Sequence, residues 1–147
     1  MEQPRMNLET VIGYKLKQAQ SALRARMDGA LRPLQLTTPQ YSCLEVIRDN
    51  PGASSAEIAR RAFVSRQTMN TLLRGLQSRG LVERGEASNS RALPTTLTRE
   101  GLRLLEEAST VVSQINHSLT ATLTEEQREQ LSAALSQCFE ALNQSDS

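Results

Sequence analysis

Apolar residues recur at steps of three and four near the start of the chain, which is the spacing of one helix face. The residues concerned are Leu8, Ile12, Leu16, Ala19, Leu23 and Met27. They predict a helix from Asn7 to about Leu31, with Gly29 and Pro33 marking its end. At ~1.5 Å per residue, a helix of roughly 25 residues is about 37 Å long, more than a compact domain of this size needs. We therefore expect a partner subunit to cover part of it.

A second helix is predicted to begin at Thr38-Pro39. Thr38 can cap it, and Pro39 suits the first helical position because the missing N–H would be unpaired there anyway. Leu44 and Ile47 give this helix an apolar side. The segment 50–52, Asn-Pro-Gly, ends it with strong turn chemistry.

Two short helices should follow, joined by a tight turn. Ser54-x-x-Glu57 has the pattern of a capping box and opens the first of them. Ser65 is expected to cap the second, and Gly80 to end it. The apolar face of this fourth helix consists of Met69, Leu72, Leu73 and Leu76.

Strand-like segments at 81–84 and 92–97 enclose a small polar loop at 85–91, the composition of a hairpin. Pro94 suits an edge strand, where one missing donor is tolerated. Two short helices followed by strand, loop and strand predict a winged helix-turn-helix. That module places one helix in the DNA major groove.

The remaining chain is again helical. Thr98 should cap a fifth helix that runs to about Thr120, and Thr124-x-x-Gln127 is a capping box that opens a sixth. The sixth helix carries a coiled-coil-like seam of Leu131, Leu135, Cys138 and Leu142. The predicted fold class is mainly α, a winged helix-turn-helix with a two-stranded β-wing and N- and C-terminal dimerisation helices. We expect one domain over 1–147, with the winged lobe at 37–98 and dimerisation helices at 7–32 and 99–144.

The composition and the distribution of charge indicate what the core is built from and what kind of partner the chain binds. Aromatic residues make up 3% of the chain and Trp is absent, so Leu, Ala, Val and Ile must build the core. The net charge is +1, but residues 54–103 carry nine Arg against four Glu, and residues 104–147 one Arg against seven acids. A basic middle indicates a polyanionic partner for that segment. Because no signal core or membrane-length apolar run is present, we expect a cytoplasmic protein.

The outward face of the fourth helix has the chemistry that reads DNA bases. Asn and Gln pair with adenine and Arg with guanine, and each bidentate contact contributes about 1–3 kcal/mol of discrimination. No Asp or Glu occurs between Ser65 and Gly80. Ser65, Arg66 and Arg84 are placed for phosphates, and Arg91 can enter a narrow minor groove. The base-reading candidates are Gln67, Thr68, Asn70, Thr71 and Arg74.

The chain resembles the multiple-antibiotic-resistance regulator (MarR) family in the segments LTTPQYSCLEVI and SAEIARRAFVSRQTMNTLLRGLQSRGLVERGEASNSRALPTTLTREG. The order is specific: a TPQ helix start, SRQT opening the recognition helix, RGLVER entering the wing, and LTREG opening the next helix. The resemblance implies a triangular homodimer with ligand-tunable DNA binding, usually for repression. The family's wing commonly reads Asp-x-Arg. Here Asn89 replaces the acid and Arg91 is kept, so both are expected wing contacts.

Catalytic chemistry is not predicted. His117 is the single histidine, and no Gly-rich phosphate loop, HExxH or CxxC pattern occurs, so no enzyme activity, metal or cofactor is expected. Cys138 lies on the apolar seam and is interpreted as packing. Cys43 has two readings: a small buried core thiol, which is favoured, or a redox-sensing thiol near the expected effector pocket.

The resemblance places an effector pocket between the DNA-binding lobe and the dimerisation helices. An apolar cleft with a few polar anchors suits a lipophilic or phenolic acid. A bound effector would favour a spacing of the two recognition helices that cannot span successive major grooves. The candidate lining residues are Tyr14, Arg24, Tyr41, Cys43 and Leu44.

The sequence thus predicts a sequence-specific DNA-binding transcriptional regulator, a repressor released by a small-molecule effector. It should bind a pseudo-palindromic double-stranded operator as a homodimer, with half-site centres about 10 bp apart. Two alternatives stay open. One is a thiol-based redox-sensing regulator that uses Cys43; the other is a winged-helix protein-interaction module without DNA binding.

Overall fold

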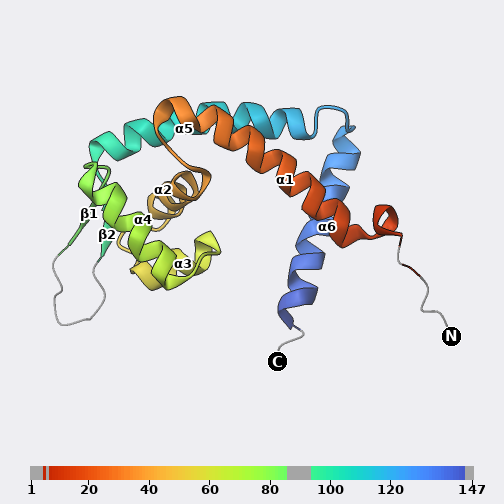
Figure 1. The fold of residues 1–147 in the computed structure, drawn as a ribbon, viewed down its shortest axis with the longest axis horizontal. Coiled ribbons are helices and arrows are strands. Elements are labelled where there is room, and N and C mark those ends of the chain that lie inside the picture. The colour runs from red at the N-terminus through yellow and green to blue at the C-terminus, as the bar shows by residue number, and fades with distance from the viewer. Residues whose placement is uncertain (1–4, 6, 86–93, 145–147) are drawn as a thin grey trace. The chain divides into compact units, whose positions relative to one another are not determined.

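A computed structural model describes residues 5, 7–85 and 94–144 (Figure 1). The chain divides into two compact units, Met1–Val112 and Ser113–Ser147. The elements in chain order are the 3-10 helix η1 (Leu8–Thr10), α1 (Ile12–Leu31), the 3-10 helix η2 (Arg32–Leu34), α2 (Thr38–Asp49), α3 (Ser55–Ala62), α4 (Arg66–Ser78), β1 (Val82–Arg84), β2 (Thr95–Leu97), α5 (Arg99–Leu119) and α6 (Glu125–Gln144). This mainly helical fold with a two-stranded sheet confirms the predicted fold class.

The predicted first helix is interrupted near its start. Instead of one helix from Asn7, the chain forms η1, an extended residue at Val11 (φ −84°, ψ 120°), and then α1. Thr10 explains the break, because both its N–H and its hydroxyl donate to the Asn7 carbonyl, at 3.0 and 2.8 Å. A short polar side chain that bonds nearby backbone in this way competes with the regular helical pattern.

The core of the first unit lies between α2 and the helices around it. α2 packs against α1, α3 and α4, and each of these helices contributes apolar side chains. The fully buried large side chains include Leu31, Leu44, Ile47, Ile58, Met69, Leu73, Leu76 and Leu105. The predicted inward positions of α4 are therefore confirmed, with Leu72 half-buried at the margin.

The sheet is antiparallel, and among the described residues Leu81 and Pro94 of the predicted strands lie outside it. Val82 pairs with Leu97 and Arg84 with Thr95. Leu81 lies outside β1, because its N–H donates to the Leu76 carbonyl at the end of α4 instead. The wing loop at 86–93, which includes the predicted contacts Asn89 and Arg91, lies outside the described residues.

The second unit consists of the end of α5 and the whole of α6. Thr124 and Gln127 form the predicted capping box, with reciprocal bonds of 2.9 and 3.1 Å at the start of α6. Across α6, which is described in full, no residue is buried. Leu131 and Leu135 are 42% and 41% exposed and Leu142 is 75% exposed. In the part of the chain that the structure describes, no helix combines the length and apolar character needed to cross a membrane.

Candidate nucleic-acid interface and effector pocket

The cap and the buried face of the recognition helix α4 determine which of its sides is exposed. Ser65 begins it as predicted, since its hydroxyl accepts a hydrogen bond of 3.1 Å from the Thr68 N–H. Met69, Leu73 and Leu76 are buried in the core. This packing turns the opposite face to solvent, and the exposed residues there are Arg66, Gln67, Thr68, Asn70, Thr71 and Arg74. The structure thus brings together on one surface all the α4 residues predicted to contact DNA.

This exposed face is suited to bind an external polar partner. Its shorter side chains bond locally: the Thr71 hydroxyl donates to the Gln67 carbonyl at 3.2 Å. Within the described ranges, the side chains of Asn70 and Arg74 form no hydrogen bond or ion pair. No acidic residue lies on α4. Donors and acceptors that the protein does not use are available for base edges and phosphates.

The turn between α3 and α4 contains a feature that sequence reasoning missed. Phe63 has φ 59°, in the left-handed region, although such turns often use glycine. Its side chain is 79% exposed, next to the start of the reading face. The signal in the sequence that could have indicated this exposed side chain was an aromatic residue in the turn between two capped helices.

Arg84 lies at the base of the wing. It is half-buried, and its Nε has no hydrogen-bond partner among the described residues. Together with Gln77 and Thr98 it lines a hollow of about 540 Å³ beside the sheet. Arg84 therefore lies half-buried on β1, at the point where the chain enters the wing.

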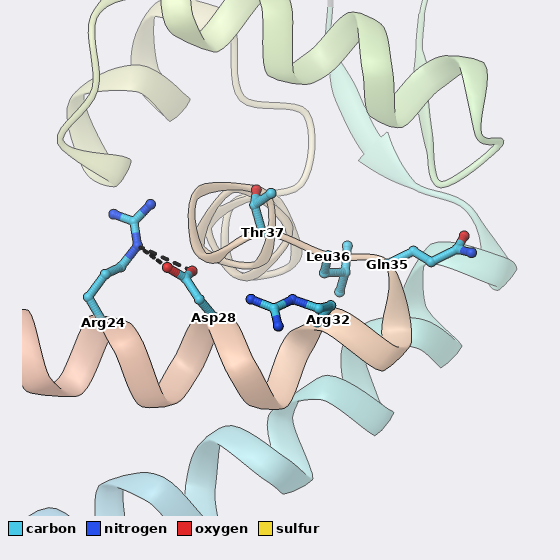
Figure 2. A pocket seen from close by; sticks show the side chains of 6 residues that line it. All are labelled: Arg24, Asp28, Arg32, Gln35, Leu36 and Thr37. Atoms are coloured by element: carbon cyan, nitrogen blue, oxygen red, sulfur yellow. Dashed lines mark hydrogen bonds and ion pairs between the residues drawn. The ribbon is translucent and has the colours of Figure 1, made fainter.

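A second pocket, of about 400 Å³, lies where α1 meets the start of α2 (Figure 2). It is lined by Arg24, Asp28, Arg32, Gln35, Leu36 and Thr37. The Arg24 Nε lies 3.3 Å from each carboxylate oxygen of Asp28. Two guanidinium groups and one carboxylate leave this pocket with a net positive charge.

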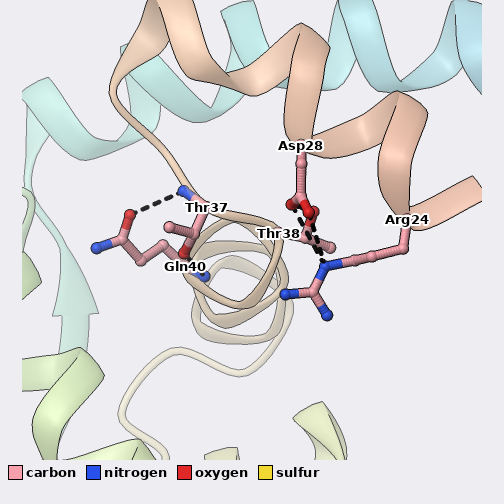
Figure 3. Close-up of polar contacts among 5 residues, drawn as sticks. All are labelled: Arg24, Asp28, Thr37, Thr38 and Gln40. Atoms are coloured by element: carbon pink, nitrogen blue, oxygen red, sulfur yellow. Dashed lines mark hydrogen bonds and ion pairs between the residues drawn. The ribbon is translucent and has the colours of Figure 1, made fainter. Parts of the chain in front are cut away.

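The hydrogen bonds at the rim of the pocket show that the prediction of Thr38 as the cap of α2 is wrong. Thr37, not Thr38, caps α2, in a capping box with Gln40 whose two bonds measure 3.2 and 2.9 Å (Figure 3). Thr38 is occupied elsewhere, because its hydroxyl donates to the Asp28 carboxylate at 2.5 Å. This hydrogen bond, and then the charge of Arg24, lower the pKa of Asp28, so its carboxylate stays ionised.

The residues predicted to line an effector pocket are not brought together around this one. Arg24 lines it, whereas Cys43 and Leu44 are fully buried in the core and Tyr14 is exposed on α1. Tyr41 is buried, and its hydroxyl donates to Glu45. Sequence reasoning missed the other lining residues. The available signal was the polar repeat of Arg24, Asp28 and Arg32 at four-residue steps, which places them on one helix face.

Cys43 has the environment of a core thiol. Its side chain is fully buried and its Sγ lies 3.5 Å from the Met69 Sδ. Burial raises the pKa of this thiol to about 12. The reactive species is the thiolate, which at pH 8 would then be about one part in ten thousand. This opposes the redox-sensing alternative.

We expect Cys43 in the native protein to resist alkylation at pH 8. Iodoacetamide followed by peptide mass analysis should leave Cys43 unmodified in the folded protein and label it fully in urea. Peroxide should change the DNA affinity of the wild type and of a Cys43→Ser variant equally. Rapid native labelling of Cys43 would restore the thiol alternative.

The described residues hold no group of three or more His, Cys, Asp or Glu side chains placed to bind a metal ion.

Comparison with known proteins identifies the scaffold. The MarR family model matches residues 34–92. The HTH-type transcriptional repressor Rv2887 of Mycobacterium tuberculosis is 41% identical over 125 residues, which cover 84% of this chain and 90% of the relative. This chain belongs to the MarR family.

This chain is similar to solved MarR-family structures that contain a small molecule or DNA. The complex of Rv2887 from Mycobacterium tuberculosis with p-aminosalicylic acid matches with TM-score 0.72 and 41% identity, over 88% of this chain and 98% of that one. The complex of Rv2887 with DNA matches with TM-score 0.73 and 38% identity over the same shares. These comparisons confirm the resemblance found in the sequence.

Proposed function

We propose that this MarR-family chain is a sequence-specific DNA-binding transcriptional repressor that an aromatic carboxylic acid releases from its operator. The observation that carries the proposal is the exposed, acid-free polar face of α4, held outward by buried Met69, Leu73 and Leu76. The relative Rv2887 is a named repressor with structures in complex with DNA and with p-aminosalicylic acid. A repressor acts where the chromosome lies, which in a bacterium is the cytoplasm.

The proposed DNA contacts divide by chemistry. Base edges are read by polar and basic side chains near the middle of α4, and phosphates are held by its N-terminus and by the wing base. Asn89 and Arg91 remain proposals, because they lie outside the described residues. The full proposed set is Ser65, Arg66, Gln67, Thr68, Asn70, Thr71, Arg74, Arg84, Asn89 and Arg91.

The active form is proposed to be a homodimer. Leu8 of η1 is 52% exposed, and Ile12 and Leu16 of α1 are 65% and 43% exposed. α6 exposes Leu131 and further apolar side chains. A second copy would bury these side chains, and hydrophobic burial contributes ~25 cal/mol per Å². Two recognition helices then meet successive major grooves, which sets half-site centres about 10 bp apart.

The pocket at the start of α2 is the proposed effector site. Its volume of about 400 Å³ is in the range of small-molecule sites. Arg24 already pairs with Asp28, whereas Arg32 forms no ion pair with a described residue. Arg32 is therefore the expected partner of an effector carboxylate, and Leu36 supplies apolar surface for its ring.

The proposed function is tested by selecting bound fragments from the source genome and measuring their affinity. The expected result is a pseudo-palindromic operator and an affinity that falls steeply with salt, since several phosphates are neutralised. Adding p-aminosalicylate should weaken binding. An affinity for the selected fragments that neither depends on salt nor exceeds that for random DNA would contradict DNA-specific repression.

We expect Arg32→Ala to weaken p-aminosalicylate binding by about 10-fold or more, the effect of losing a charge-assisted hydrogen bond of ~1.5–3 kcal/mol. Isothermal titration with the DNA-free protein measures it. Arg26→Ala is the matched control, because Arg26 is an exposed arginine of α1, six residues before Arg32, and does not line the pocket. Equal affinities for the two variants would remove Arg32 from the site.

A further inference from the structure

We propose that Arg79 is a positioning residue that couples the pocket at the start of α2 to the recognition helix. This inference rests on the proposed function, because it concerns how occupancy of that pocket changes DNA binding. The Arg79 Nη1 donates a 2.6 Å hydrogen bond to the backbone oxygen of Gln35, across 44 residues of sequence. Gln35 lines the pocket (Figure 2), and Arg79 is the C-cap residue of α4. The bond therefore joins the wall of one site to the helix of the other.

On the pocket side, hydrogen bonds hold the backbone of Gln35 in a left-handed conformation. Its φ of 56° and ψ of 37° are left-handed. Its N–H donates to the Arg32 carbonyl at 2.9 Å, and the Leu36 N–H donates to the Leu31 carbonyl at 3.2 Å, the pattern of a Schellman turn. A residue other than glycine is strained in this region, and the conformation persists only where neighbouring contacts hold it. Arg79 holds it from outside the turn.

The same turn carries the proposed carboxylate partner. Arg32 lines the pocket with its side chain and accepts the Gln35 N–H with its carbonyl. A ligand that draws in the Arg32 side chain therefore acts on the turn that sets the position of the Gln35 oxygen. Arg79 itself does not line the pocket, so its substitution leaves the ligand's own contacts in place.

On the DNA side, α4 acts as a lever. Its 13 residues span about 20 Å at ~1.5 Å per residue. Arg79 lies at the C-terminal end, and the reading face begins at the N-terminal end. A tilt of roughly 10° about one end displaces the other by about 3.5 Å, close to the ~3.4 Å rise of one base pair. A small tilt of α4 at its Arg79 end is thus sufficient to change the register of the reading face, and in this proposal the ligand favours the tilted population.

The test measures a coupling factor, the ratio of the DNA dissociation constants with and without saturating p-aminosalicylate, using the full chain and its selected operator. Arg79→Met keeps the length of the side chain and removes the donor, whereas Arg79→Lys keeps a donor. Arg103→Met is the charge control, because Arg103 is an exposed arginine of α5 that pairs with Glu100. Isothermal titration of each DNA-free variant with p-aminosalicylate accompanies these measurements.

We expect the wild type and Arg103→Met to share one coupling factor, in the range of ~5- to 150-fold that allosteric coupling commonly reaches. Arg79→Met should bring the factor close to 1, and Arg79→Lys should retain most of it. Affinity of the DNA-free protein for p-aminosalicylate should stay within about 2-fold in all variants. By linkage, the same factor must describe how DNA changes the affinity for p-aminosalicylate.

Each other outcome overturns the inference, and two of them leave the proposed function standing. A wild-type coupling factor in Arg79→Met means that the bond carries no coupling. Loss of p-aminosalicylate binding in Arg79→Met means that Arg79 builds the pocket rather than transmitting its state. A wild type whose DNA affinity ignores p-aminosalicylate contradicts the proposed effector response, and the inference fails with it.

Discussion

Gly101→Ala is expected to lower the free energy of unfolding by about 3 kcal/mol or more, the upper range for overpacking a well-packed site. A Cβ at Gly101 would lie 2.0 Å from the backbone oxygen of Leu81. That oxygen cannot rotate away, because it accepts the Thr98 N–H at 3.1 Å, while the Thr98 hydroxyl donates to the Gly80 carbonyl at 2.6 Å. The clash is therefore with backbone that joins α4, β1 and the start of α5.

The measurement is thermal or urea unfolding at one fixed protein concentration, because dimer formation adds to the apparent stability. A loss of this size lowers the Tm by roughly 10 °C for a chain of this length. Gly75→Ala is the matched control. No atom lies within 4 Å of a Cβ built at Gly75, and it is inside α4, so alanine should raise stability by about 0.5–1 kcal/mol. Equal stability of the two variants would show that the close approach at Gly101 is absent in solution.

Asn70→Ala and Arg74→Ala are each expected to weaken operator binding by about 1–3 kcal/mol, roughly 5- to 150-fold, and to relax base preference at one position. Both side chains are exposed on α4 and unpaired within the described residues, so their loss removes contacts with DNA and leaves the core intact. Stability should therefore change by less than about 0.5 kcal/mol. Binding to the operator and to its single-base variants measures both effects.

A comparison of Arg66→Ala with Arg128→Ala separates the loss of a phosphate contact from the loss of one positive charge elsewhere on the protein. Arg66 lies in the first turn of α4, where a phosphate contact weakens binding to all sequences alike and lowers the salt slope by about 1. Arg128 carries the same charge on α6 and should have little effect on affinity. If Asn70→Ala and Arg74→Ala bind every tested sequence like the wild type, the reading face of α4 is wrongly assigned.

Most local elements and the chemistry of the reading face could be predicted from the amino-acid sequence. Ser65, Thr98 and Thr124 cap their helices as predicted, because a cap needs only a hydroxyl and a backbone N–H two or three residues away. The apolar period of α4 predicted which face is buried, and hence that Asn70 and Arg74 point outward. Caps and apolar periodicity depend on residues within one or two helical turns of each other. They can therefore be recognised from the order of residues alone.

Features that join residues far apart in sequence could not be predicted in this way. The hydroxyl of Thr38, the predicted cap of α2, instead donates to Asp28 on another helix, and Thr37 is the cap. Of the five residues predicted to line an effector pocket, only Arg24 lines the pocket at the start of α2, and the packing buries Cys43 beside Met69. The close approach at Gly101 and the bond from Arg79 to Gln35 are also contacts between elements. They depend on distances that only the packed core sets, and no periodicity along the chain encodes those distances.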